Sequence, residues 1–209
     1  MDEIIVNKFR NKQVLDYLDV GSGDGIRAIS IAKKIACKKI TLVDNSEILH
    51  SCRNLTSDIN ISLNLIKSSI CEIQITKKYD LITCLWNVLG HLNDIDERER
   101  TFLKFKKVLS KHGSLVIDVN NRYNISNYGY VNVMHNLSRD ILNDLNSGWF
   151  TLNIGNDSTN VYIHAPLEID AMCNKVGLKV SQVIYIDYNS GEVKDTFFEG
   201  QLLYIISHA

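Results

Sequence analysis

The sequence predicts a single α/β domain in which buried strands alternate with amphipathic helices, and three observations support that fold class. A strand, a glycine-rich turn, a helix and a second strand follow one another within residues 15–44. Further apolar runs occur at 61–66, 79–86 and 114–119, separated by stretches with helical periodicity. A chain of 209 residues holds one such domain with a substantial core, whereas two full domains would be cramped.

The first strand ends in a glycine-rich turn. Residues 14–20 are mostly apolar, which predicts a short buried strand, and Gly21, Gly23 and Gly25 follow at alternate positions. Glycine can turn sharply and lets a bound ligand approach bare backbone. Apolar residues then recur every three or four positions through 26–36, which predicts a helix. A strand, a glycine turn and a helix N-terminus together are typical of a nucleotide-type pocket.

Acidic residues accompany this turn. A second apolar run at 40–43 ends on Asp44, which is placed to accept hydrogen bonds from two ribose hydroxyls. The glycines are spaced Gly-x-Gly-x-Gly, whereas a turn that holds a pyrophosphate needs Gly-x-Gly-x-x-Gly. Asp19 before the first glycine and Asp24 within the loop would repel phosphate. They suit a ligand with a cationic amino group.

At these residues the chain resembles the class I S-adenosylmethionine-dependent methyltransferases, whose glycine loop has the pattern acid-x-Gly-x-Gly-x-Gly, as residues 19–25 do. The resemblance continues through Asp44, 79–82 and 113–117, and so covers nearly the whole chain. It implies a Rossmann-like, mostly parallel sheet of seven strands with helices on both faces and an antiparallel last strand. It also implies S-adenosyl-L-methionine as cofactor, S-adenosyl-L-homocysteine as product, and a cofactor site at the strand ends.

The resemblance places cofactor contacts at the ends of four strands. An acid after the third strand often binds the adenine amino group in this family, but here Ser68 and Ser69 occupy that turn. A hydroxyl or a backbone group must then bind the adenine, or Glu72 must reach back. The segment after the fourth strand packs beneath the methionine part in the family. The cofactor-binding residues that we predict are Asp19, Gly21, Ser22, Gly23, Asp44, Asn45, Ser69, Ile70, Leu85, Trp86 and Asn87.

The remaining elements follow in order. Residues 1–13 allow a short helix over the cofactor mouth, and 47–55 a helix that Ser46 can cap. The charged stretch 94–111 has one apolar side, which predicts a helix with a solvated face that His112 and Gly113 end before the fifth strand. Pro166 stands where a final helix begins. Residues 180–187 and 197–207 alternate as a closing hairpin would, and the latter is the family's reversed strand.

A long polar and aromatic segment separates the fifth strand from the final helix. About forty residues are too many for a plain connection, so we expect an inserted lid of small helices and strands at about 122–160 within a single methyltransferase domain spanning 1–209.

Composition limits the classes of partner and the compartment. Lys and Arg number 23 against 24 for Asp and Glu, so the net charge of −1 disfavours nucleic acid as a partner. The five cysteines show no Cys-x-x-Cys spacing, which predicts reduced thiols in a cytoplasmic protein. Without a leader or an apolar run of about 18 residues, secretion and membrane insertion are disfavoured. We expect a cytoplasmic monomer or homodimer.

Methyl transfer from a sulfonium is an in-line displacement at carbon. The protein must hold the nucleophile about 3 Å from the methyl carbon and exclude water, and an amine must arrive without its extra proton. Aromatic and His residues in the lid would suit a cationic or amine substrate. The catalytic candidates are His91, Tyr128 and His164, and the substrate-binding candidates are His91, Asn121, Arg122, Tyr128, Trp149 and Tyr162.

Each candidate has a structural alternative. His91 is equally suited to helix capping or packing, Arg122 to a salt bridge within the lid, and the aromatic residues to packing the lid on the sheet. The six histidines are dispersed, so we expect no metal site. Ser22 lies in Gly-Ser-Gly and not in the Gly-x-Ser-x-Gly elbow of a serine hydrolase.

The favoured function is therefore an S-adenosylmethionine-dependent methyltransferase of small-molecule biosynthesis. An amine nitrogen is the favoured target, because the resemblance is to small-molecule members with a similar stretch after the fourth strand. An O-methyltransferase of natural-product metabolism and a tRNA or protein methyltransferase are the alternatives. A cofactor-binding partner subunit without turnover is the non-enzyme alternative, although intact Asp19, Gly21, Gly23 and Asp44 argue against a decayed pocket.

Overall fold

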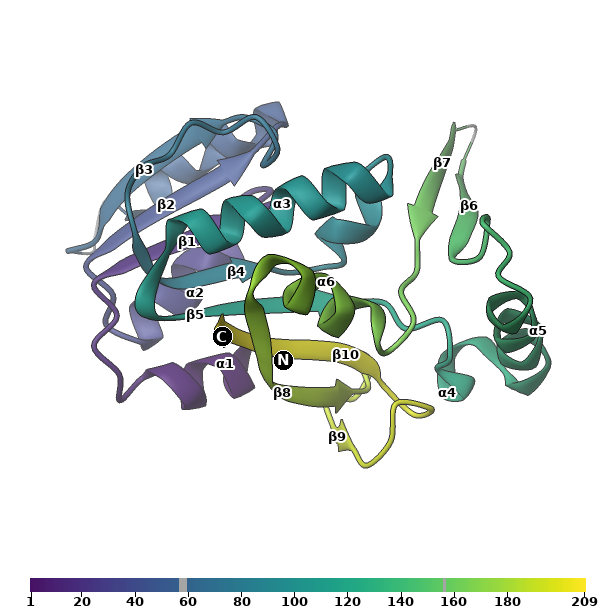
Figure 1. Ribbon diagram of the computed structural model, residues 1–209. Coiled ribbons are helices and arrows are strands. Elements are labelled where there is room, and N and C mark those ends of the chain that lie inside the picture. The colour runs from purple at the N-terminus through teal and green to yellow at the C-terminus, as the bar shows by residue number, and fades with distance from the viewer. Residues whose placement is uncertain (57–59, 156) are drawn as a thin grey trace.

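The computed structural model describes residues 1–56, 60–155 and 157–209. Its main sheet has eight strands in the order β3-β2-β1-β4-β5-β10-β8-β9 (Figure 1). The first five strands in sequence are parallel to one another, and the last three join antiparallel. The bounds are β1 Asp16–Val20, β2 Lys39–Asp44, β3 Ser62–Lys67, β4 Tyr79–Cys84, β5 Leu109–Val119, β8 Leu178–Ile186, β9 Val193–Lys194 and β10 Gln201–His208.

This arrangement confirms the predicted fold class, a mostly parallel α/β sheet with an antiparallel last strand. The eighth strand is the two-residue β9, which pairs with the end of β8 at the sheet edge. The two segments expected as a hairpin do pair, from Gln201 opposite Ile186 to His208 opposite Leu178. β10 lies between β8 and β5, so the last strand of the chain is an inner strand.

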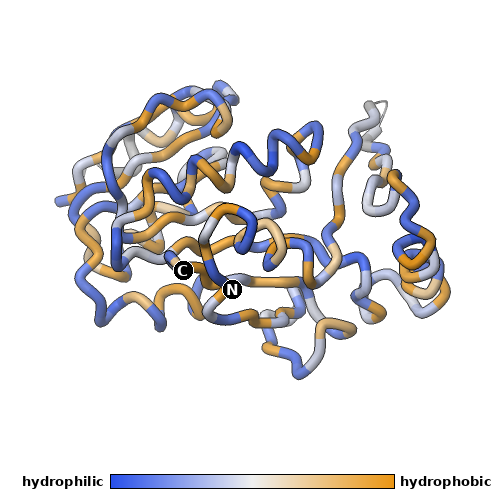
Figure 2. The backbone as a smooth tube through the Cα atoms, in the orientation of Figure 1, coloured by the Kyte–Doolittle hydropathy of each residue, from blue (hydrophilic) through white to orange (hydrophobic). Residues whose placement is uncertain are grey.

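Helices cover both faces of the sheet (Figure 1). α1 (Asp2–Phe9) and α2 (Ile26–Lys34) pack on one face, and α3 (Ile95–Val108) and α6 (Glu168–Val176) pack on the other. Alternate residues of the central strands serve the two cores: Leu81 of β4 belongs to the α1 and α2 side, and Ile82 to the α3 and α6 side. Apolar residues accordingly fill the inner strands, while α3 carries a hydrophilic outer side (Figure 2).

Two predicted boundaries were wrong at the fifth strand. α3 ends at Val108 and β5 begins at Leu109, so His112 and Gly113 lie inside the strand and do not end the helix. The pairing with β4 shifts register between Tyr79 and Leu81. A side chain at Gly113 would lie 2.8 Å from the Tyr79 carbonyl oxygen, so the shifted strands approach most closely where the glycine stands. The pattern of apolar residues in the sequence does not indicate such a register shift.

Two other elements differ in kind or length from the expectation. β4 stops at Cys84, because Trp86 and Asn87 adopt positive φ values of 67° and 54° that a strand does not allow. The expected helix after β2 is a 3-10 helix, η1 (Glu47–Thr56). Ahead of α3, Asp94 accepts a hydrogen bond from the Glu97 N–H at 2.7 Å, which fixes the helix start.

The segment between β5 and α6 stands beyond the carboxyl ends of the parallel strands (Figure 1). It consists of α4 (Ile125–Tyr128), α5 (Tyr130–Ile141) and an antiparallel hairpin of β6 (Trp149–Ile154) and β7 (Asp157–Tyr162). A short 3-10 helix, η2 (Val88–His91), follows β4 and contacts β7. Among the helices of the described ranges, none is long and apolar enough to cross a membrane.

Candidate functional site

The glycine turn after β1 has the geometry that only glycine adopts easily. Gly21 has a φ of +70° and donates its N–H to the Val43 carbonyl at 2.8 Å. A Cβ on Gly21 would lie 2.3 Å from a methyl carbon of Val88, so the turn and η2 touch through bare backbone. Gly25 also has a positive φ, +69°, at the start of α2. The glycine loop is thus held between β2, through the hydrogen bond to Val43, and η2, through the close approach to Val88.

Asp44 organises the loop from the end of β2. One of its carboxylate oxygens accepts the Gly23 N–H at 2.8 Å, and the other accepts the N–H and the hydroxyl of Ser46 at 2.8 and 2.6 Å. The residue is only partly buried, so its carboxylate also faces a cavity of about 220 Å³. This Asp44 cavity is lined by Val20, Gly21, Val43, Asp44, Asn45, Ser68, Ser69, Ile70, Val88, His91 and Leu92.

A second cavity of about 370 Å³ lies on the other side of Gly21. Asp19 at its floor is buried and accepts a hydrogen bond from the Thr83 hydroxyl. Burial raises the pKa of Asp19 to about 6, and the charge of Asp44 adds to that shift. This Asp19 cavity is lined by Asp19, Gly21, Ser22, Gly23, Asp24, Arg27, Leu85 and Trp86.

Together these two cavities collect ten of the eleven predicted cofactor residues, because all but Asn87 line one or the other. The two cavities share Gly21. The Asp44 cavity combines a carboxylate with apolar walls from Ile70, Val88 and Leu92. The Asp19 cavity is lined by the carboxylate residues Asp19 and Asp24.

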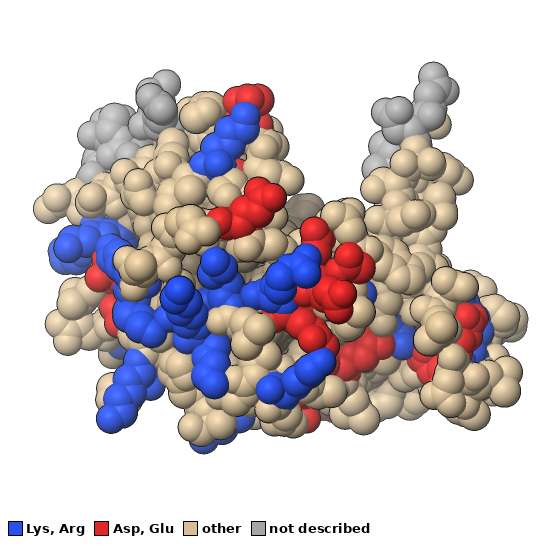
Figure 3. Space-filling model, turned by 45° about the horizontal axis from the view of Figure 1, so that its top comes forward, with Lys and Arg blue, Asp and Glu red and all other residues tan. Residues whose placement is uncertain are grey.

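A third and larger cavity, of about 670 Å³, adjoins both. It shares Arg27 and Trp86 with the Asp19 cavity and His91 with the Asp44 cavity. Leu152 and Val161 of the hairpin form its far wall, and the space-filling view shows the molecule hollowed between the sheet and the hairpin (Figure 3). The remaining residues that line this large cavity are Met1, Asp2, Asn87, Asp118, Asn120, Ile186, Asp187, Tyr188 and Gly191.

Asp118 is the buried carboxylate on the wall of the large cavity. It accepts the backbone N–H of Trp86 and the hydroxyl of Tyr188. Burial raises the pKa of Asp118 to about 6, although both hydrogen bonds and the charge of Arg27 oppose that shift. Burial and the nearby carboxylate likewise raise the pKa of Tyr188. A carboxylate whose pKa lies near neutrality at a cavity wall can accept a proton.

Arg27 and Trp86 lie where the Asp19 cavity meets the large cavity. The Trp86 side chain is 74% exposed and the Arg27 guanidinium lies 5.7 Å from its ring centre. Arg27 also donates from Nε to a carboxylate oxygen of Asp2 at 2.7 Å, which ties α1 to the start of α2. The large cavity is lined by three carboxylate side chains, those of Asp2, Asp118 and Asp187, and by one guanidinium, that of Arg27.

Asn87 connects the turn after β4 to the end of β5. Its side-chain oxygen accepts the N–H of Asn120 at 3.0 Å. Its buried amide nitrogen has no hydrogen-bond partner among the described residues, although Asn87 lines the large cavity.

The structure places Arg122 at the base of the insertion and away from the large cavity. It donates to both carboxylate oxygens of Asp140 at 2.8 and 2.9 Å, to Glu168 at 2.7 Å and to the Ile163 carbonyl at 2.8 Å. The contacts of Arg122 are therefore those of a salt bridge, which was its structural alternative. Asn121, fully buried beside it, donates from its side chain to the Gly200 carbonyl at 2.9 Å.

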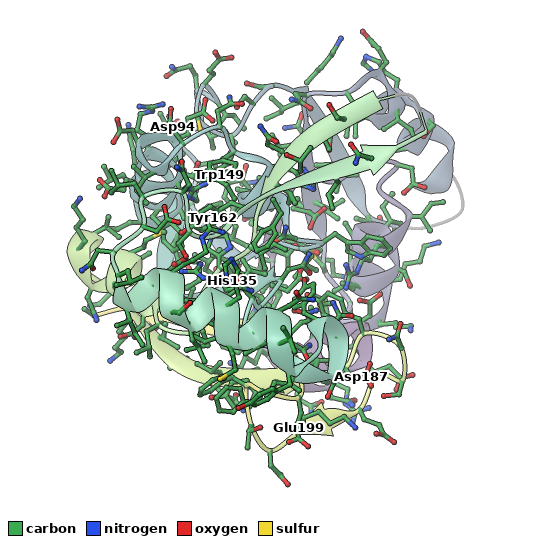
Figure 4. All side chains as sticks on the ribbon, turned by 90° about the vertical axis from the view of Figure 1, so that its right-hand side faces the viewer. Asp94, His135, Trp149, Tyr162, Asp187 and Glu199 are labelled. Carbon is green, nitrogen blue, oxygen red and sulfur yellow. The ribbon has the colours of Figure 1, made fainter. Side chains whose placement is uncertain are left out.

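The aromatic residues of the insertion pack on one another. Trp149 and Tyr162 lie together at the root of the hairpin, with ring centres 5.3 Å apart (Figure 4). The guanidinium of Arg98 from α3 lies 4.0 Å from the Tyr162 ring centre. His164 is fully buried with its ring 4.9 Å from that of Tyr162, and burial puts its pKa well below the usual value. Trp149, Tyr162 and His164 thus have the packing role that was their structural alternative. His91, in contrast, lines the large cavity.

Sequence reasoning missed several residues of the large cavity, above all Arg27, Asp118, Asp187 and Tyr188. Asp118 stands near the carboxyl end of β5, where open α/β sheets bind ligands, so its position was a usable signal. Tyr188 follows β8, and its approach to Asp118 depends on the order of the antiparallel strands.

Part of the chain matches a known family. Residues 18–113 match the model of a family described as a methyltransferase domain. The chain is 24% identical over 123 residues to a ubiquinone biosynthesis O-methyltransferase of Rickettsia akari (strain Hartford), covering 58% of this chain and 47% of that protein. A protein of the same name from Rickettsia bellii (strain OSU 85-389) is 27% identical over 121 residues, with 57% and 48% covered. The chain spans about half the length of these curated relatives.

Solved structures share the fold over the full chain. An S-adenosylmethionine-dependent methyltransferase from Clostridium acetobutylicum ATCC 824 superposes with a TM-score of 0.72 at 16% identity, covering 100% of this chain and 90% of that one. The N-methyltransferase NodS from Bradyrhizobium japonicum WM9, in complex with S-adenosyl-L-homocysteine, gives 0.66 at 14% identity, with 99% and 85% covered. The amino pentose methyltransferase CalS10 from Micromonospora echinaspora gives 0.64 at 11%, with 100% and 90% covered.

Proposed function

We propose that this chain, in which residues 18–113 match a methyltransferase-domain family, is a class I S-adenosylmethionine-dependent methyltransferase that methylates a small-molecule acceptor at an amine nitrogen. The observation that carries the proposal is the large cavity. It adjoins both the Asp19 cavity and the Asp44 cavity, and its lining holds three carboxylates and one guanidinium. Such a cavity attracts a protonated amine and repels an anion.

The chain's own residues fit the methyl donor. Gly21 leaves its backbone bare where a Cβ would strike Val88, and the Asp44 carboxylate faces the neighbouring cavity. In the proposed arrangement Asp44 holds the ribose hydroxyls, Ser69 and Ile70 flank the adenine, and Asp19 faces the cationic amino group of the methionine part. The net negative charge of these side chains suits a sulfonium donor and disfavours a diphosphate.

The donor supplies an activated methyl group, so the protein has three tasks. It must orient the acceptor, exclude water and remove a proton from an ammonium before the nitrogen can attack. Arg27 and Trp86 line both donor and acceptor space, and so define where the methyl group meets the nitrogen. The exposed Trp86 ring also offers a face to a cationic acceptor.

The Asp118 and Tyr188 pair is the proposed proton acceptor. Tyr188 donates its hydroxyl proton to the Asp118 carboxylate and takes one from the acceptor ammonium, so the proton ends on Asp118 and the amine becomes neutral. Burial raises the pKa of Asp118 to about 6, so this carboxylate binds a proton more readily than an exposed aspartate does. The raised pKa lies closer to that of an ammonium, which eases the transfer.

Transfer to oxygen is the second candidate, favoured by the names of the curated relatives, which are O-methyltransferases. A hydroxyl acceptor would need a base near the donor. His91 lies between the Asp44 cavity and the large cavity and could take that proton.

One experiment separates these candidates. Calorimetry with S-adenosyl-L-methionine and S-adenosyl-L-homocysteine tests the donor site first, and micromolar binding of either is expected. Labelled methyl transfer to a panel that pairs each amine with its hydroxyl analogue then identifies the target atom. Transfer to the amines supports the proposal, and transfer to the hydroxyl members alone refutes it in favour of the second candidate. Donor binding without transfer to any small molecule, tRNA or protein would instead favour a cofactor-binding subunit.

A further inference from the structure

A fourth cavity, of about 240 Å³, opens on the far side of Tyr188 from the donor site. It lies between α4, the end of β5, the β8–β9 turn and the start of β10. Each of its ten lining residues has a side chain with a hydrogen-bonding group, and none of the ten is Lys, Arg or His. This polar cavity is lined by Asn120, Asn124, Ser126, Asn127, Tyr128, Asp187, Tyr188, Asn189, Glu199 and Gln201.

The polar cavity is an extension of the large one. Asn120, Asp187 and Tyr188 line both, so the two spaces meet around the tyrosine whose hydroxyl bonds Asp118. Asp187 and Glu199 both line the polar cavity, and both lie in the lower part of the molecule in Figure 4. An acceptor that reacts beside Trp86 can therefore reach past Tyr188 into the polar cavity.

The lining residues indicate which chemical groups the polar cavity can bind. Two carboxylates and no cationic side chain exclude a phosphate or carboxylate group by repulsion. Amides and hydroxyls both donate and accept hydrogen bonds, which matches a neutral group with several hydroxyls. Two side chains of the lining are buried and already held in place. The Asn124 side chain accepts the Asn127 N–H at 3.1 Å, and the Gln201 side chain accepts the Asn121 N–H at 2.6 Å.

From these observations we propose that the polar cavity binds a neutral, polyhydroxylated part of the acceptor, such as a sugar ring or a polyol. The reacting nitrogen stays in the large cavity. This inference rests on the proposed function, because it assigns the second half of the same acceptor. It predicts that hydroxyl groups distant from the reacting nitrogen raise affinity.

The test compares two ring amines of similar size, D-glucosamine and cyclohexylamine, by calorimetry on protein saturated with S-adenosyl-L-homocysteine. D-glucosamine should bind about tenfold more tightly, since its hydroxyls gain one or two hydrogen bonds. Asn127 and Asn189 are exposed residues of the lining, and the Asn127 side chain bonds the hydroxyl of Tyr128, which also lines the polar cavity. In the Asn127→Leu, Asn189→Leu double variant, the preference should fall to about twofold or less while cyclohexylamine binding is unchanged.

The matched control is Asn153→Leu, an exposed asparagine on β6 that lines none of the four cavities. It should keep the wild-type preference for D-glucosamine. Equal binding of the two amines to the wild type, or a preference that survives in the double variant, would overturn the inference. Loss of S-adenosyl-L-homocysteine binding would contradict the proposed function itself, so the two failures are distinguishable.

Discussion

The backbone N–H of Trp86 donates to the carboxylate of Asp118 across the two central strands of the sheet. Trp86 lines the Asp19 cavity and the large cavity, so this bond joins the donor and acceptor sides of the site to one buried acid. Trp86 has a positive φ of 67°, so the chain departs from strand geometry at the residue that donates this bond. The charge state of Asp118 is therefore linked to the shape of the turn that separates donor from acceptor.

The first prediction is that methyl transfer to an amine declines as pH falls through about 6. Asp118 has a pKa of about 6 and must be a carboxylate to take the acceptor's proton. The measurement is kcat/KM for the amine against pH, with the methyl donor saturating. Saturation matters because Asp19 on the donor side also has a pKa of about 6.

Asp118→Asn keeps an oxygen for the Trp86 N–H but cannot accept the proton. It should lower kcat by about a hundredfold, the usual contribution of a positioned base, and remove the acid limb. An unchanged limb in this variant would show that another group is the base.

The second prediction concerns stability. The pKa of Asp118 rises from 3.8 to about 6 on folding, so the folded state binds this proton more tightly than the unfolded chain does. Its contribution therefore destabilises the protein as pH rises from about 4 to about 6, by up to about 3 kcal/mol. Urea unfolding of the wild type and Asp118→Asn at pH 4 and pH 7 measures this contribution. The variant should gain stability relative to the wild type at the higher pH, and no relative change would contradict the burial argument.

The third prediction tests the ribose role of Asp44. Asp44→Ala removes a charge-assisted acceptor and should weaken S-adenosyl-L-homocysteine binding by about 1–3 kcal/mol in calorimetry. The change also frees the Gly23 N–H, so the melting temperature must be measured alongside. Asp96→Ala, at an exposed acid on α3, is the matched control and should leave affinity as it was. Wild-type affinity in Asp44→Ala would contradict the assigned role.

The fourth prediction uses two glycines with positive φ values. Gly21 and Gly129 have φ values of +70° and +78°, but a Cβ would strike Val88 only at Gly21 and would meet open space at Gly129. Gly129 combines its φ with a ψ of 156°, a region open almost only to glycine, so its alanine variant should lose about 1–3 kcal/mol of unfolding free energy from backbone strain alone. Gly21→Ala should lose more and should also lose donor binding. Equal losses in urea unfolding would show that the contact with η2 is not needed.

The sequence was sufficient for the parts of the site that are local in the chain. Gly21, Gly23 and Asp44 belong to one strand–turn–helix–strand unit, and their spacing alone predicted that they meet. The parallel order of the early strands, and the reversed β10, followed from the family resemblance. These features depend on short-range spacing, which a sequence displays directly.

The acceptor side depends on contacts between distant segments. Asp118 and Tyr188 meet only because β10 lies between β5 and β8 and the chain turns beyond β8 toward the same sheet end. Arg122 and His164 looked like ligand-binding residues because they follow a ligand-bearing strand and sit in the expected lid. They are instead buried against Asp140 and Tyr162. This burial depends on how the segment between β5 and α6 packs, and no local sequence pattern indicates that packing.

The fifth prediction follows from that packing. Arg122 is 4% exposed and pairs with Asp140 and Glu168, so Arg122→Leu leaves two partly buried carboxylates without their cation. The free energy of unfolding should fall by about 3 kcal/mol or more. Affinity for S-adenosyl-L-homocysteine should persist in the folded fraction, because Arg122 lines neither donor cavity.

Arg139→Leu is the control for this change. Its pair with Asp144 is more exposed, at 24% and 36% for the two side chains, so the loss should stay below about 1 kcal/mol. Urea unfolding of both variants measures the difference. A stable Arg122→Leu protein with a raised KM for the acceptor would instead assign Arg122 to the substrate. In that case the insertion would have to open far enough to expose the guanidinium, because Asp140, Glu168 and the Ile163 carbonyl now occupy its donors.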